Sequence, residues 1–147
     1  MKLSKKLEKE KKEKIMNKEP FESDLCRTSA RLFKYAAEHN YDMEDFAKFY
    51  MNHEFTNLEL DGDYTPFAAS FARELLEILE YPEQKGEVLA DPDVASWIGY
   101  MYRLIQIRKG VHSKDVYANL PYSKMELLWV GGHTIADEMF IEDLPEL

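Results

Sequence analysis

Residues 92–109 constrain the fold most, because they form a helical segment that is apolar on nearly every side. Asp91-Pro92 is typical of a helix start, with a capping carboxylate before a proline at the first helical position. Gly110 follows two basic residues, which is typical of a helix end. A helix without a polar face is stable in water only when other elements cover it. We therefore expect residues 92–109 to lie inside a domain.

Amphipathic spacing and capping residues predict further helices before this segment. The first begins near Ser23 and ends at Asn40, and the next has Asp42 as its N-cap. Thr65-Pro66 predicts the start of a third helix. Apolar residues recur from Phe67 to Leu79 as a wide stripe, so we expect this third helix to be a central core helix.

Shorter helices are predicted towards the C-terminus. Ser113 is the expected N-cap of one, and Ser123 with Glu126 forms a capping box for the next. We expect Gly131-Gly132 to break that helix, and residues 133–140 to form a last turn or two. Alternating polar and apolar segments of strand length are missing. The sequence therefore predicts an all-α, compact orthogonal bundle of roughly five to seven helices.

The charge is divided unevenly along the chain. Residues 1–18 contain eight lysines and three glutamates, a net charge of +5, so the total of −9 leaves −14 for residues 19–147. We expect residues 19–147 to form a single domain with this acidic surface, which favours a basic protein partner and repels nucleic acid. The lysine-rich arm, residues 1–18, is expected to be a solvated helix or disordered. A basic arm that contacts nucleic acid or an acidic partner is the alternative.

The sequence favours a soluble protein of a reducing compartment. No apolar segment approaches the ~20 residues that span a bilayer, and no apolar segment follows the basic N-terminus as in a signal peptide. Cys26 has no second cysteine for a disulfide within the chain, which fits the cytoplasm. We interpret Cys26 as a small buried hydrophobic residue. The sequence leaves homo-oligomerisation open.

The residue patterns do not favour catalysis or metal binding. No histidine lies three or four residues from another histidine or from Cys26, so a local zinc pair is missing. Asp61-Gly62-Asp63 resembles the start of a calcium loop, but Pro66 and Ala72 occupy the positions that need glycine and glutamate. We interpret it as a turn. The sequence therefore predicts a protein that is not an enzyme and has no cofactor or metal. A small enzyme that uses Arg103, His133 and Asp137 is the weakest alternative.

Residues 107–130 partly fit a DNA-binding helix-turn-helix. The fit is poor, because Tyr117 occupies a position that needs a small residue and Pro121-Tyr122 replaces a turn with glycine. The segment from Ser123 that would read DNA offers one lysine and several apolar residues. A nucleic-acid-binding transcriptional regulator with a degenerate helix-turn-helix at 107–130 is therefore the second hypothesis.

Six residues form the predicted partner surface. Trp97, Tyr100 and Arg103 share one helical face and belong to the residue types enriched at interface hot spots. They are also ordinary core residues, and burial in the core is slightly favoured over a place at an interface. A buried Arg103 would need a carboxylate or aromatic partner. The full predicted set is Trp97, Tyr100, Arg103, Tyr117, His133 and Asp137.

The last third of the chain resembles a group of small uncharacterised bacterial proteins. The residues that carry the resemblance are Trp97 to Arg103, Ser113-Lys114, Tyr117, Pro121, and Gly132-His133-Thr134 with the ending Ile141-Glu142-Asp143-Leu144. That group is encoded beside a predicted ADP-ribosyltransferase-like toxin. The resemblance implies a role in a toxin–antitoxin or defence locus. Our first hypothesis is therefore a non-enzymatic, protein-binding regulator or inhibitor, such as an antitoxin that neutralises a basic toxin or effector.

Overall fold

The computed structural model describes residues 22–62 and 71–147, and this part of the chain is all-α. It has no strand and one isolated bridge, between Tyr41 and Lys85. A helix passes through residues 22–38. The other elements are α2 (Met43–Asn52), the π-helix η1 (Thr56–Leu60), α3 (Ala72–Leu79), α4 (Pro92–Lys109), α5 (Ser113–Asn119), α6 (Tyr122–Gly132) and α7 (Asp137–Glu142). The all-α prediction is confirmed. The lysine-rich arm and the predicted helix start at Thr65-Pro66 lie outside the described residues.

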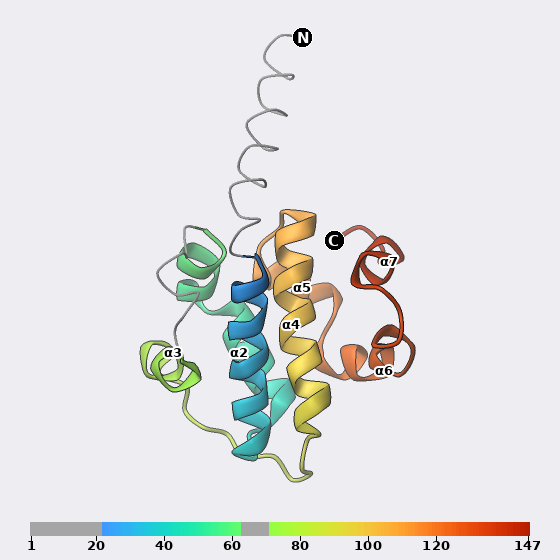
Figure 1. Ribbon diagram of the computed structural model, residues 1–147. Coiled ribbons are helices and arrows are strands. Elements are labelled where there is room, and N and C mark those ends of the chain that lie inside the picture. Colours follow the sequence, from blue (N-terminus) through green and yellow to red (C-terminus); the bar gives the residue numbers. More distant parts are fainter. Residues whose placement is uncertain (1–21, 63–70) are drawn as a thin grey trace.

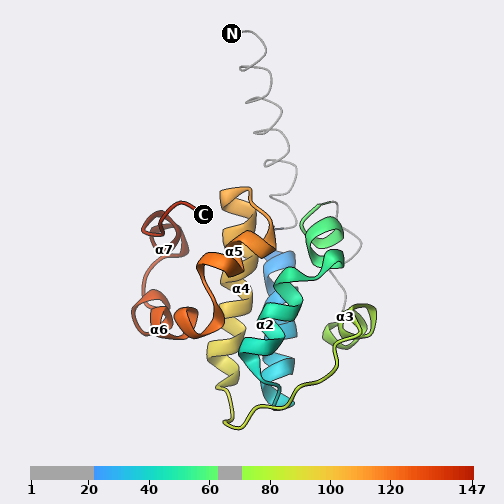
Figure 2. The same cartoon turned by 180° about the vertical axis from the view of Figure 1, so that it is seen from behind.

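Helix α4 lies inside the molecule, as its apolar sequence predicts. It lies beside the 22–38 helix and α2 in both views of the ribbon (Figures 1 and 2). Every residue from Met101 to Ile107 is buried. Seven consecutive residues span almost two turns, so every side of this part of the helix is covered. Gly99 allows the 22–38 helix to approach closely, since a Cβ there would lie 2.5 Å from the Ser29 carbonyl oxygen.

Local capping signals predict several helix boundaries correctly. Asp91 caps α4 by accepting a hydrogen bond from the Asp93 amide at 2.8 Å, and Gly110 ends the helix with φ of 64°. Asp42 caps α2 by accepting from the Asp45 amide at 3.1 Å. Asn40, with φ of 60°, follows the end of the 22–38 helix. These boundaries depend on neighbours within a few residues, which is why sequence alone finds them.

The predicted helix up to Leu79 is confirmed over Ala72–Leu79, but its predicted place in the centre of the core is wrong. Phe71 has an extended backbone, with ψ of 150°, and is 71% exposed, so α3 begins only at Ala72. Only Leu75 and Leu79 of α3 are buried, and Ile78 is 45% exposed. Figures 1 and 2 show α3 at the edge of the molecule, on the side opposite α6. A wide apolar stripe therefore does not place a helix in the core when the facing helices cover only one narrow strip.

The predicted caps of α5 and α6 are also corrected, because distant side chains replace them. His112 and Pro121 are the N-cap residues, and neither makes a side-chain cap. Asp61 accepts from the Ser113 amide at 2.7 Å. Glu44 accepts from the Tyr122 amide at 2.8 Å and from the Ser123 amide at 3.2 Å. These carboxylates satisfy the free amides at both helix starts.

Gly131-Gly132 does not break α6, contrary to the prediction, because both glycines are helical. Gly132 faces α7, where a Cβ would lie 2.7 Å from the Phe140 ring. Helix α6 is therefore one helix that ends where it contacts the C-terminal segment. None of the described helices combines the length and apolarity needed to cross a membrane.

Candidate functional site

Arg103 lies in the core and not on a partner surface, which corrects its predicted role. Its side chain is 4% exposed. Its Nη1 donates to Asp61 Oδ1 at 2.5 Å, and its Nη2 donates to the Tyr50 hydroxyl at 3.0 Å. Burial lowers its pKa, but Tyr50 and Asp61 outweigh that effect and raise the pKa of the guanidinium above its usual value. Arg103 therefore stays charged and ties α4 to α2 and to the end of η1.

Asp61 is the structural residue that sequence reasoning missed. It was interpreted as part of a turn, yet its side chain is 2% exposed. Besides Arg103 it binds Ser113, whose amide and hydroxyl donate to it at 2.7 Å and 2.6 Å. The signal available in the sequence was the buried arginine, which requires a carboxylate from elsewhere in the chain. Nothing in the sequence indicates which of the many carboxylates takes that place.

Tyr117 holds helices together and is separated from the rest of the predicted surface. Its hydroxyl donates to Glu44 Oε2 at 2.9 Å. The same carboxylate caps α6, so one residue of α2 holds both α5 and α6. Burial and the hydrogen bond to Glu44 raise the pKa of the Tyr117 hydroxyl above its usual value. Tyr117 therefore remains protonated as the donor of this link.

The other four predicted residues lie together on the C-terminal side. The Trp97 ring packs edge-on against Phe140, with ring centroids 5.3 Å apart. Tyr100 and Asp137 are half-buried neighbours. The pKa of Tyr100 is raised mainly by burial, and to a lesser extent by the nearby Cys26 and Asp137. His133 follows the end of α6, where its ring stacks on Trp129 at 4.0 Å and its Nδ1 bonds the Trp129 carbonyl oxygen. Trp97 and Tyr100 of α4 thus face the C-terminal segment that carries His133 and Asp137.

Exposed apolar side chains gather on the same side of the molecule. Leu127 is 78% exposed and Val130 is 69% exposed, although both belong to a regular helix. With Gly131 they follow three- and four-residue spacing, which places them on one face of α6. We call these three residues the outer face of α6. Met139 and Ile135, in and beside α7, are also more than a third exposed.

The segment that carries this apolar surface is acidic overall, with Glu126 four residues before Val130 and Lys124 three residues before Leu127 on α6. Residues 122–147 contain six carboxylates and one lysine, a net charge of −5. A groove of about 570 Å³ also lies between residues 85–90 and the start of α6. Burial, with the nearby charge of Glu44, raises the pKa of Glu126 in its wall. The carboxylates that line this groove are Asp42, Glu44, Glu87 and Glu126. The C-terminal segment therefore combines exposed apolar side chains on α6 with a net negative charge.

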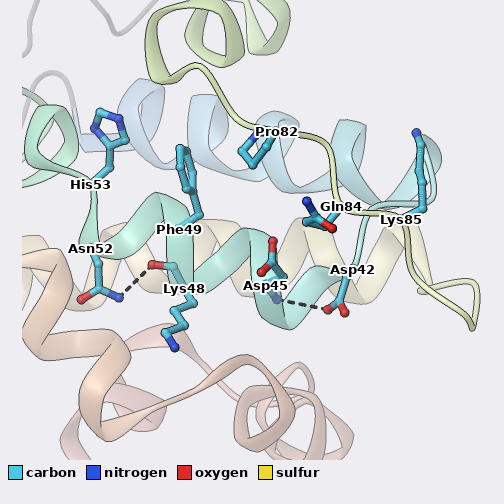
Figure 3. Close-up of a pocket in the computed structure, with 9 residues that line it drawn as sticks. All are labelled: Asp42, Asp45, Lys48, Phe49, Asn52, His53, Pro82, Gln84 and Lys85. Atoms are coloured by element: carbon cyan, nitrogen blue, oxygen red, sulfur yellow. Dashed lines mark hydrogen bonds between the residues drawn. The ribbon is translucent and has the colours of Figure 1, made fainter.

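A second, larger groove of about 730 Å³ runs beside α2 (Figure 3). Phe49 of α2 and Pro82 of the loop after α3 lie on facing sides of it. The polar groups that line it are held by local bonds: Asp45 accepts from the Tyr81 hydroxyl at 2.7 Å, and the Asn52 amide donates to the Lys48 carbonyl oxygen at 2.8 Å. These groups fix the two ends of α2 and the loop, so we assign the groove a structural role.

The described residues contain no group of three His, Cys, Asp or Glu side chains that could hold a metal ion. Cys26 is fully buried, and burial raises the pKa of its thiol to about 12. This confirms its interpretation as a small buried residue. Comparison of the chain with protein-family models, with curated proteins and with solved structures finds no match in any of the three.

Proposed function

We propose that this protein is a non-enzymatic, protein-binding domain that regulates or neutralises a basic partner, such as a bacterial toxin or effector. The observation that carries the proposal is the exposed apolar surface of α6, which lies in a segment of net negative charge. Leu127 and Val130 are each more than two-thirds exposed. Contiguous exposed apolar surface with polar surroundings is typical of protein interaction sites. The resemblance to bacterial proteins encoded beside a toxin supports the same partner class.

The charge of the chain supports a basic partner in particular. Residues 19–147 carry a net charge of −14, and four carboxylates line the groove at the start of α6. A complementary basic surface would be attracted over a Debye length of about 10 Å, which accelerates association and excludes acidic competitors. The same charge repels phosphate groups, so the hypothesis of a nucleic-acid-binding regulator has less support.

The test is co-expression of the full chain with the protein encoded by the neighbouring gene. We expect the two proteins to elute together on gel filtration and the partner's toxicity to be suppressed. The two proteins should elute separately as the salt concentration rises, because screening weakens the attraction between their charges. Separate elution at low salt, with toxicity unchanged, would contradict the proposal. Complex formation with DNA at low salt, without binding to the neighbouring protein, would favour the nucleic-acid hypothesis.

A further inference from the structure

We propose that the outer face of α6 docks one amphipathic, basic helix of the partner, and that Gly131 is where the two helices approach most closely. This inference rests on the proposed protein-binding function and specifies its site and ligand.

Gly131 has no role in the packing of the protein itself. A Cβ at Gly131 would meet no atom within 4 Å. Its neighbour Gly132 differs, because a Cβ there would lie 2.7 Å from the Phe140 ring. Gly131 also lacks the left-handed backbone that requires glycine at Gly110. A helical glycine at an open surface destabilises its helix relative to alanine. Glycine at this position leaves a stretch of the helix backbone uncovered, so another helix can contact it closely.

The side chains beside Gly131 suit a helical ligand. Leu127 lies four residues before Gly131 and Val130 lies next to it, so two exposed apolar side chains flank the bare backbone. Ridges of side chains on one helix pack into such grooves of another. Amphipathic helices bind partners through apolar residues at this three- and four-residue spacing. The opposite face of α6 is already occupied by buried contacts of Tyr122, Met125 and Gly132.

The charge around this face selects a basic ligand. Residues 122–147 have a net charge of −5, and Glu126 lies on α6 itself, next to Leu127. Lysine or arginine beside the apolar stripe of a ligand helix would be attracted by this net negative charge and would meet Glu126 on the Val130 side of the face, away from Lys124 on the Leu127 side. A second copy of this chain would bring the same negative charge to the interface, and an anionic membrane would also be repelled. A basic helix of another protein is therefore the favoured occupant.

The test uses the full chain and a synthetic probe. The probe is an amphipathic peptide of about five helical turns, with leucine at helical spacing and lysine elsewhere. Two control peptides replace lysine with glutamate, or leucine with serine. Binding is measured by chemical-shift changes of the labelled protein. We expect the leucine–lysine peptide to shift the amides of α6 and both control peptides to bind at least about tenfold more weakly.

Variants of the protein locate the site. We expect Gly131→Leu and the double variant Leu127→Ser/Val130→Ser to weaken binding about tenfold or more. Both should keep the wild-type far-ultraviolet spectrum, and Gly131→Leu should melt at or above the wild-type temperature. Ile78→Ser is the matched control, because Ile78 is also exposed but lies in α3, on the opposite side of the molecule (Figure 1). It should bind like the wild type.

Several results would overturn the inference. Wild-type affinity in Gly131→Leu, equal binding of the glutamate peptide, or shifts confined to other elements would each do so. A dimer that Gly131→Leu abolishes would instead assign the face to a second copy, and binding to anionic vesicles would assign it to a lipid surface. If the neighbouring protein binds every variant with wild-type affinity, the proposed function stands and this site is wrong. If it does not bind the wild type, the proposed function itself fails.

Discussion

At the scale of single residues, Asp61 has more consequences for this fold than any member of the predicted surface. Burying a charged pair costs desolvation energy, which good geometry and additional hydrogen bonds must offset. Here the Asp61 carboxylate accepts from Arg103 and from the amide and hydroxyl of Ser113. Arg103 in turn donates to Tyr50 and Gln106. The pair is therefore satisfied on both sides, and removal of one partner leaves several polar groups unsatisfied.

We predict that Asp61→Ala destabilises the protein by about 3–5 kcal/mol, because Arg103 would remain buried without its carboxylate. Urea unfolding followed by circular dichroism measures the change. The control is Glu22→Ala, which breaks the partly exposed ion pair with Arg108, where N and O are 2.7 Å apart. Such a pair contributes about 0–1 kcal/mol. Equal losses of unfolding free energy in the two variants would show that the buried pair contributes no more to stability than the partly exposed pair.

We predict that Cys26 does not react with thiol reagents in the native protein. The thiolate is the reactive form, and burial raises the pKa of Cys26 to about 12 while its side chain is fully covered. Modification by a coloured disulfide reagent at about pH 8 should therefore require unfolding and should accelerate sharply in urea. Reaction in native buffer at the rate of the unfolded chain would mean that the 22–38 helix opens readily.

At the scale of elements, α6 shows how two adjacent glycines can serve opposite purposes. Gly132 faces inward and lets α6 pack on Phe140, whereas Gly131 faces open space. The start of the same helix depends on Glu44 of α2, which also binds Tyr117 of α5. The position of α6 is thus set by contacts with α4, α2 and α7, while its outer face makes no comparable contacts.

We predict opposite effects for alanine at these two positions. Gly131→Ala should stabilise the protein by about 0.5–1 kcal/mol, because alanine favours the helix and meets no neighbour. Gly132→Ala should destabilise it by about 1–3 kcal/mol, because its Cβ would displace the Phe140 ring. Thermal unfolding of the two variants compares them directly. A loss of stability in both would mean that α6 cannot accept any side chain at its C-terminal end.

At the scale of the whole molecule, charge is the dominant surface property. The body of the chain carries −14 against +5 on residues 1–18. Like charges on a folded domain repel one another and oppose the compact state. The buried apolar cluster, which includes residues of the 22–38 helix and of α2 to α7, offsets that repulsion. This excess of carboxylates is also the property on which the proposed choice of a basic partner depends.

We predict that moderate salt stabilises the free protein. Raising sodium chloride from about 0.02 M to about 0.3 M shortens the Debye length from roughly 20 Å to 6 Å and screens the repulsion. The melting temperature should rise by a few degrees. The same change should weaken the complex with a basic partner, so salt is expected to act in opposite directions on folding and on binding. A melting temperature that falls with salt would indicate that ion pairs outweigh the repulsion.

Sequence alone determined those parts of this protein that depend on nearby residues. The bounds of α4 follow from Asp91, Pro92 and Gly110, and its burial follows from apolar residues on nearly every side. The start of α2 follows from Asp42. Caps and helical periodicity act over a few residues, so their energies can be judged without knowing the fold. The all-α class is a sum of such local preferences.

Only the tertiary structure decided which distant groups meet. Asp61 rather than another carboxylate neutralises Arg103, Glu44 replaces the predicted cap of α6, and the stripe up to Leu79 lies at the edge of the molecule. It also divided the predicted surface, because Arg103 is buried against Asp61 and Tyr117 binds Glu44, whereas Trp97 and Tyr100 face the C-terminal segment. The physical reason is that pairing and burial depend on positions in space, and one sequence pattern is compatible with many such arrangements.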